Sequence, residues 1–89
     1  MIESDTDSEK FFEDVLALIE GPRDQKYGDS TENHARIAAM WSVLLNKNIT
    51  VQEVYLCLIA IKLSRLTQSP HHRDSWLDIA GYAALAEKE

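Results

Sequence analysis

The chain has 89 residues, of which 45% are hydrophobic and 27% charged, and its net charge is −6. This length supports one domain with a modest core, and the sequence contains no apolar run of about 18 residues that would predict a membrane span. The negative charge disfavours general nucleic-acid binding, because a protein that binds the phosphate backbone needs a basic surface.

The acidic residues are concentrated at the N-terminus. Residues 1–14 hold six acids and one base, Lys10, so they contribute −5 and the rest of the chain only −1. We therefore expect a flexible acidic N-terminus over residues 1–7 and a single domain over residues 8–89. The single cysteine, Cys57, lies in an apolar run, which predicts a buried free thiol and a cytoplasmic protein.

The first half of the chain predicts two helices. The first is capped by Asp7 or Ser8 and runs to Glu20, where Gly21 and Pro22 end it. The second is capped by Ser30 or Thr31 and runs to about Asn46. The polar connection over residues 21–31 is long for a turn between helices, and long loops are often functional.

The second half predicts two more helices. Thr50 and Glu53 form a capping box, which begins a helix that runs to about Thr67. This helix is apolar nearly all round and should be the central, most buried one. After a break at Pro70, the last helix runs from about Arg73 to about Ala86. We therefore predict a compact all-α domain of four helices, and such a small core favours a homo-oligomer.

Four charged residues near the break are candidates for a site. Lys62 and Arg65 end the third helix, and Asp74 and Asp78 lie four residues apart on the fourth. If these helices are antiparallel neighbours, the two bases could hold phosphate oxygens. The two acids could then hold a divalent cation or accept hydrogen bonds from a ligand. The alternative is an internal ion-pair network that only fixes the helix register.

The other reactive residue types give weaker signals. The adjacent His71 and His72 and the distant His34 have no zinc-ligand spacing, and no nucleotide-binding glycine loop or nucleophile elbow occurs. We therefore expect no required cofactor, although Mg²⁺ is compatible with Asp74 and Asp78. Trp41 could stack on a base, but core packing is the commoner use of such a residue.

Several phrases of the sequence resemble a family of small phage and prophage domains of undefined function. The resemblance covers about residues 21–86. It rests on four phrases, which are Arg23-x-x-Lys26-Tyr27-Gly28-Asp29, Glu32-Asn33-His34-x-Arg36-Ile37-Ala38-x-x-Trp41-Ser42, Lys62-Leu-Ser-Arg65-Leu66 and Asp74-Ser-x-x-Asp78-Ile-Ala-Gly-Tyr82.

That family is similar in turn to the MazG-like all-α nucleotide pyrophosphohydrolases and to part of the deoxynucleotide kinase of T7-like phages. The resemblance implies an oligomeric helical bundle that binds a nucleotide between helices. MazG-like enzymes carry Glu-x-x-Glu and Glu-x-x-Asp motifs to hold Mg²⁺, whereas this chain has Lys62-x-x-Arg65 in place of the first and Ser75 three residues before Asp78. Two bases in this position repel Mg²⁺ and attract phosphate.

The resulting hypothesis is a phage-type nucleotide-binding protein that sequesters a signalling nucleotide in the host cytoplasm, as an anti-defence protein would. The alternatives are a Mg²⁺-dependent nucleotide kinase or phosphohydrolase, whose catalytic residues the sequence does not identify, and an acidic protein-interaction module. The ligand-binding roles are phosphate binding by Lys62, Arg65 and Arg36, orientation by Asp74 and Asp78, an aromatic wall from Tyr27 and Trp41, and base recognition by Asn33.

Overall fold

The protein is all-α in the part that the computed structural model describes, which is residues 6–20 and 30–89. Its helices are α1 (Thr6–Glu20), α3 (Ser30–Leu45), α4 (Val51–Gln68) and α5 (Arg73–Glu87). No strand occurs in these residues, so the predicted four-helix, all-α class is confirmed. None of the described helices is long and apolar enough to cross a bilayer.

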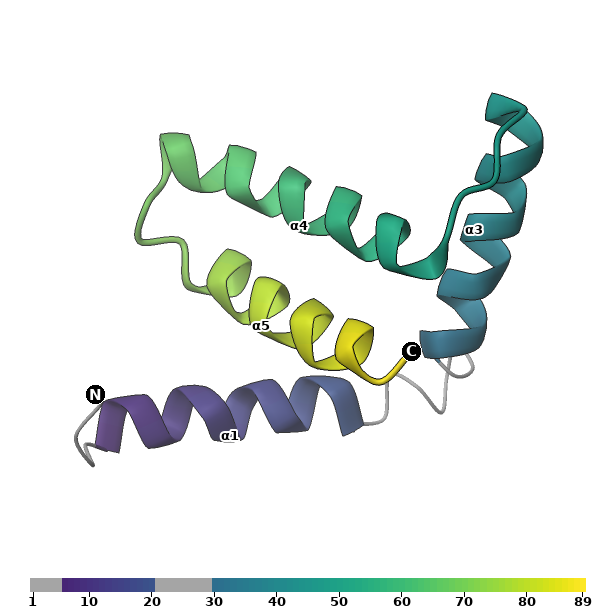
Figure 1. Ribbon diagram of the computed structural model, residues 1–89. Helices are drawn as coiled ribbons and strands as arrows, with labels where there is room; N and C mark the ends of the chain where they lie inside the picture. Colours follow the sequence, from purple (N-terminus) through teal and green to yellow (C-terminus); the bar gives the residue numbers. More distant parts are fainter. Residues whose placement is uncertain (1–5, 21–29) are drawn as a thin grey trace.

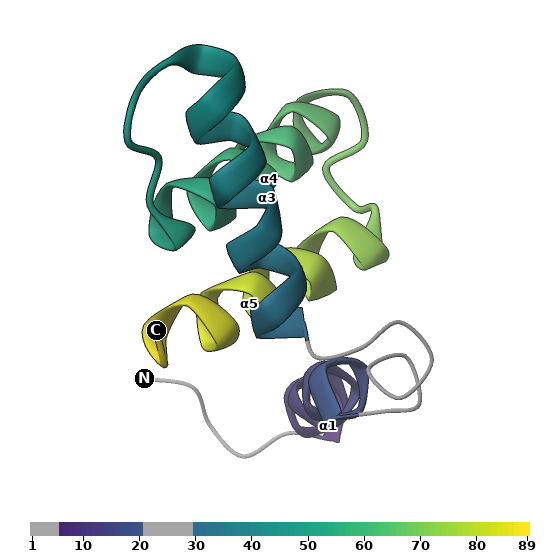
Figure 2. The same ribbon diagram turned by 90° about the vertical axis from the view of Figure 1, so that its right-hand side faces the viewer.

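Three helices lie side by side and one crosses their end. α4 and α5 form an antiparallel pair joined by the turn at Pro70, and α1 packs against α5 on the side away from α4 (Figure 1). α3 crosses the N-terminal end of α4 steeply, as both views show (Figure 2). Among the described helices, α5 is therefore covered on two sides, whereas α4 is covered along its length only by α5.

The start of α4 follows the predicted capping box. The Thr50 hydroxyl accepts a hydrogen bond from the Glu53 backbone N–H at 3.1 Å, and Glu53 Oε1 accepts one from the Thr50 N–H at 2.9 Å. These bonds satisfy two of the donors that a helix start leaves without partners. The preceding turn passes through Asn46 with a φ of 51°, and Ser42 Oγ accepts from the Ile49 N–H at 2.9 Å.

The core is small and draws on all four helices. α1 and α5 approach closely at Gly81, where an added Cβ would lie 3.4 Å from Cγ2 of Ile19. The missing side chain of Gly81 therefore permits close packing of the two helices. The buried hydrophobic residues are Val15, Ala38, Val54, Tyr55, Leu66 and Leu85.

Three expectations need correction. The third predicted helix, α4, is not buried on all sides, because Leu56 and Ile61 remain 64% and 62% exposed. Cys57 is exposed and not buried, since it lies on the same side of α4, which no helix of the described chain covers. The first helix begins at Thr6, which is one to two residues before the expected caps. The predicted loop at residues 21–31 lies outside the described residues apart from its last two.

Candidate functional site

The α4–α5 pair brings together one cation and one anion of the predicted four. Lys62 Nζ lies 2.9 Å from Asp78 Oδ2, and the two side chains are 24% and 25% exposed. The helices are antiparallel neighbours, as the sequence argument required, so residues from the end of α4 face residues from the first half of α5. This ion pair is shielded enough to be ordered, yet solvent still reaches both groups.

Arg65 and Asp74 do not join this pair. Both are exposed, and neither takes part in an ion pair among residues 6–20 and 30–89. Arg65 lies about one helical turn from Lys62, and Asp74 lies about one helical turn from Asp78. Both are displaced towards the turn at Pro70. The four charges therefore do not satisfy one another completely, and an exposed guanidinium remains next to the Lys62–Asp78 pair.

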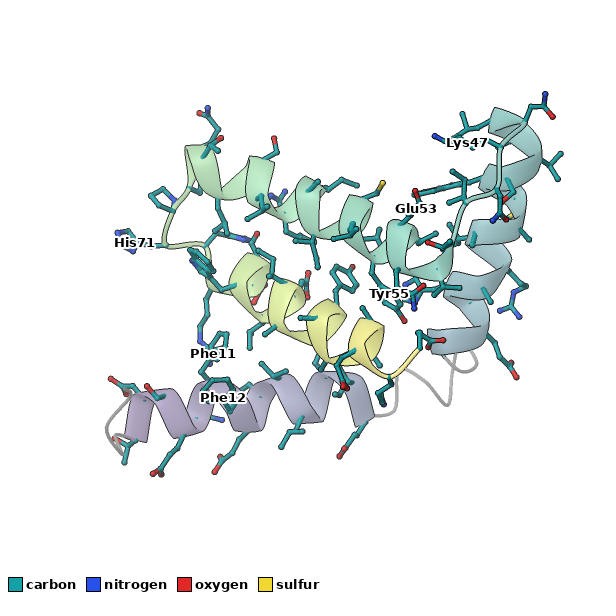
Figure 3. The ribbon with its side chains drawn as sticks, viewed as in Figure 1. Phe11, Phe12, Lys47, Glu53, Tyr55 and His71 are labelled. Carbon is teal, nitrogen blue, oxygen red and sulfur yellow. The ribbon has the colours of Figure 1, made fainter. Side chains whose placement is uncertain are left out.

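An aromatic cluster lies farther along the same α4–α5 contact. His34 of α3, Tyr55 of α4 and Tyr82 of α5 meet where the three helices converge. Of these residues, Figure 3 labels Tyr55. The ring centroids of His34 and Tyr55 are 4.6 Å apart, and Tyr82 lies 6.2 Å from His34 and 6.3 Å from Tyr55. Tyr55 is fully buried, whereas Tyr82 is half-buried.

The ion pair and the aromatic cluster lie along the same two helices, α4 and α5. Tyr82 follows Asp78 by one turn of α5, and Tyr55 precedes Lys62 by two turns of α4. We refer to Lys62, Asp78 and Tyr82, with the neighbouring Arg65, as the inter-helix site. It presents a cation, an anion and an aromatic ring with partial access to solvent.

The remaining predicted site residues lie elsewhere. Asn33 and Arg36 are exposed on α3, and the structure records no hydrogen bond or ion pair between them and Lys62 or Asp78 in the described chain. Trp41 is half-buried on the α3 stripe that includes His34 and Ala38. Tyr27 lies outside the described residues. The structure therefore does not bring α3 residues into the Lys62–Asp78 pair.

Sequence reasoning missed the aromatic cluster. The sequence predicts an N-cap or surface role for the histidines, but the His34 side chain is buried. A signal was available, because His34, Ala38 and Trp41 follow the i, i+4, i+7 spacing of one helix face. A histidine on such a face is expected to pack inside the domain.

The turn before α5 is fixed by side-chain contacts, which position Asp74 and Asp78. The Trp76 indole N–H donates to the Pro70 carbonyl at 2.9 Å, and His72 Nδ1 lies 2.7 Å from the buried Ser75 hydroxyl. Trp76 is therefore a structural residue that closes the turn. His72 occupies the N-cap position of α5, where its side chain makes no capping hydrogen bond.

Arg73 then ties this turn to α1. Its guanidinium donates to Asp14 Oδ2 at 2.7 Å and lies 5.8 Å from the centre of the Phe11 ring, below the start of α5 (Figure 3). Hydrogen bonds from Lys10 and Arg73 hold the pKa of Asp14 below its usual value.

No described group of three or more His, Cys, Asp and Glu side chains is arranged to hold a metal ion. Asp78 is instead the partner of Lys62, and Asp74 is exposed. A divalent cation at Asp78 would have to approach the Lys62 ammonium, which repels it. The arrangement is therefore better suited to binding an anion beside Lys62 than to binding a cation beside Asp78.

Comparison with known proteins gives a phage context. Residues 10–89 match the profile of a family described as "Domain of unknown function (DUF6378)". The chain is 40% identical over 72 residues to the Gene 55 protein of Mycobacterium phage L5, and the aligned region covers 80% of this chain and 46% of that protein. It is 38% identical over 81 residues to the Gene 55 protein of Mycobacterium phage D29, and the aligned region covers 91% of this chain and 54% of that protein.

The chain thus spans about half the length of these two phage relatives. No solved structure is significantly similar to it.

Proposed function

The chain belongs to the family described as "Domain of unknown function (DUF6378)", and we propose that it is a small nucleotide-binding protein of phage type. Membership confirms the expected resemblance to a phage domain family of undefined function. The finer resemblance to MazG-like enzymes and to the kinase of T7-like phages is part of the proposal. The Asp78-x-x-x-Tyr82 segment of this chain supplies two groups of the inter-helix site.

The observation that carries the proposal is the partly exposed Lys62–Asp78 pair beside Tyr82. An ammonium has three donors, and Asp78 occupies one of them, so a phosphate oxygen can take another. Arg65, one turn away, adds a guanidinium whose planar fork suits two phosphate oxygens. Tyr82 offers an aromatic surface to a base or sugar, in place of the wall expected from Tyr27 and Trp41.

In this proposal the two acids do not bind a metal. Asp78 orients Lys62, and Asp74 accepts hydrogen bonds from the sugar or base of the ligand. A protein that holds a nucleotide in this way, without the metal ligands of a hydrolase, would sequester it. A phage would benefit from removing a host signalling nucleotide. We therefore propose that the biological role is sequestration of such a nucleotide.

Titration calorimetry against a panel of nucleoside mono-, di- and triphosphates and cyclic nucleotides tests the proposal. Lys62→Gln and Arg65→Gln should each weaken binding about tenfold to a hundredfold, because each removes a charged hydrogen bond. Lys47→Gln is the matched control, since Lys47 is an exposed lysine in the turn between α3 and α4 (Figure 3). The proposal is wrong if no nucleotide binds, or if Lys62→Gln binds as well as Lys47→Gln.

Chromatography of the bound nucleotide separates sequestration from catalysis. The proposal expects the nucleotide to be recovered unchanged after incubation with and without Mg²⁺. Turnover that requires Mg²⁺ and is lost in Asp78→Asn would instead identify a nucleotide kinase or phosphohydrolase. An acidic interaction module would depend on residues 1–7, so deleting them should abolish activity, whereas nucleotide binding should change little. Residues 1–5 of this segment lie outside the described residues.

A further inference from the structure

The side of α4 that faces away from α5 carries an apolar surface that residues 6–20 and 30–89 do not cover. We call Leu56, Cys57, Ala60, Ile61 and Leu63 the outer face of α4. Leu56, Ile61 and Leu63 are 64%, 62% and 50% exposed, and Cys57 and Ala60 are also exposed. Isolated exposed leucines are common on proteins, but a contiguous apolar surface of this kind marks an interaction site.

The composition of α4 indicates that this face is normally covered. A helix that is hydrophobic all round is expected to be buried, and α5 covers only its inner side (Figure 1). The deepest positions of α4, Val54 and Tyr55, are fully buried against neighbouring helices. The outer face has the same apolar character but no neighbouring helix in the described part of the chain. We therefore expect another molecule to cover it.

Charge and side-chain order favour a second copy of this chain as that partner. The whole chain carries −6, so two copies repel each other except where their contact surfaces lack charge. No charged side chain occurs in α4 between Glu53 and Lys62, and depletion of charge is typical of interface centres. A basic partner protein would find a single acid on this face, Glu53 at the N-terminal end of α4.

The spacing of the face fits helix pairing. Leu56, Ala60 and Leu63 lie four and three residues apart, which is the a/d spacing of a helix–helix seam. The large–small–large order reads the same in both directions. An antiparallel copy therefore places leucine opposite leucine and alanine opposite alanine.

We propose that two copies of the chain pair through the outer faces of α4, antiparallel, about a two-fold axis near Ala60. Such an isologous contact is the commonest symmetry of homo-oligomers. It is independent of the proposed nucleotide binding, because Lys62 follows Ala60 by two residues and so points about 200° away around the helix axis. The pair leaves both inter-helix sites on its outside.

Sedimentation equilibrium measures the mass of the particle in solution and tests this pairing. The wild-type protein should have twice the mass of the chain. Ala60→Glu puts a charge at the centre of the face and should halve the mass, while helix content by circular dichroism stays unchanged because alanine and glutamate are both good helix formers. Ala83→Glu is the matched control, an exposed alanine on α5 that should leave the mass of the pair unchanged.

Cys57 provides a second readout that does not depend on a folding-sensitive variant. It is the only cysteine in the sequence and lies on the outer face. A short bis-maleimide should link two wild-type chains through Cys57, and the linkage should disappear in Ala60→Glu and remain in Ala83→Glu.

A monomeric wild-type protein overturns the proposal. So does an Ala60→Glu protein that keeps the double mass. The other apolar surface, the groove lined by Ala39, Met40, Val43 and Leu44 on α3, provides the competing result. If Val43→Glu halves the mass and Ala60→Glu does not, copies pair through α3 and the outer face of α4 is not the interface.

Discussion

The two sides of α4 have similar hydrophobic content but different surroundings. Its inner side packs on α5 and holds the fully buried Tyr55 and the ion-paired Lys62. Its outer side carries Leu56, Ile61 and Leu63, which none of the four described helices covers. The comparison shows that hydrophobic pattern alone does not locate a core. One side of α4 stabilises the chain, and the other is suited to a contact with another molecule.

The largest expected difference between the sides is in folding stability. Tyr55→Ala should lower the free energy of unfolding by about 3–5 kcal/mol, because it removes a buried aromatic ring from the contact with His34 and Tyr82. Leu56→Ala should change it by only about 0.5 kcal/mol, as for other surface positions. Urea denaturation checks both.

Both substitutions should be made in the Ala60→Glu protein, so that loss of self-association does not contribute to the result for Leu56. Equal losses at Tyr55 and Leu56 in that protein would contradict the assignment of an inner and an outer side.

A smaller effect is expected from the ion pair on the inner side. A double-mutant cycle with Lys62→Gln and Asp78→Asn should give a coupling energy of about 0.5–1 kcal/mol, because the groups are only partly shielded from water. The cycle on Lys10 and Asp14, in which the Lys10 side chain is 67% exposed, should give a smaller value. If the coupling energy between Lys62 and Asp78 is no larger than that between Lys10 and Asp14, partial burial does not strengthen the ion pair.

Both sides of α4 begin at the same N-terminal cap, so loss of this cap should destabilise the whole helix. Thr50→Ala should lower the free energy of unfolding by about 1 kcal/mol, since the Glu53 N–H loses its acceptor. Thr50→Ser keeps the hydroxyl and should stay close to wild type in the same denaturation experiment. A Thr50→Ser protein as unstable as Thr50→Ala would show that the hydroxyl hydrogen bond is not responsible.

The smallest expected effect is at the contact of α1 with α5, far from both sides of α4. Because Lys10 and Arg73 lower the pKa of Asp14 in the folded state, this contact stabilises the protein above the unfolded pKa of about 3.9. The contribution is lost as pH falls through the lower, folded pKa. Hydrogen exchange in α1 should therefore become faster below about pH 4.

The Asp14→Asn protein is the control, because it lacks this titration and its exchange in α1 should not respond to the same change of pH beyond the change in intrinsic rate. A wild-type protein with the same pH response as Asp14→Asn would exclude a role for the carboxylate.

The helix limits were largely predictable, because their signals are local. Gly21 and Pro22 end α1 at Glu20, the Thr50 capping box begins α4, and Pro70 separates α4 from α5. The approach of Lys62 to Asp78 was also predictable, since a short turn between two helices makes them antiparallel neighbours.

The rest depends on how the helices cross. His34, Tyr55 and Tyr82 meet only because α3 crosses the end of α4, and no local pattern encodes that crossing. The exposure of Leu56 was unpredictable for another reason. An apolar stripe has the same sequence pattern whether its own chain or a partner covers it.

Native mass spectrometry of the protein purified from its host tests the central claim most directly, namely that α4 binds a nucleotide beside its inner side and a second copy on its outer side. We predict a two-chain particle that retains nucleotide, a Lys62→Gln particle with two chains and no nucleotide, and an Ala60→Glu particle with one chain and nucleotide still bound. A wild-type protein that appears as a single chain without nucleotide, even after a nucleotide panel is added, would contradict the account on both sides of the helix.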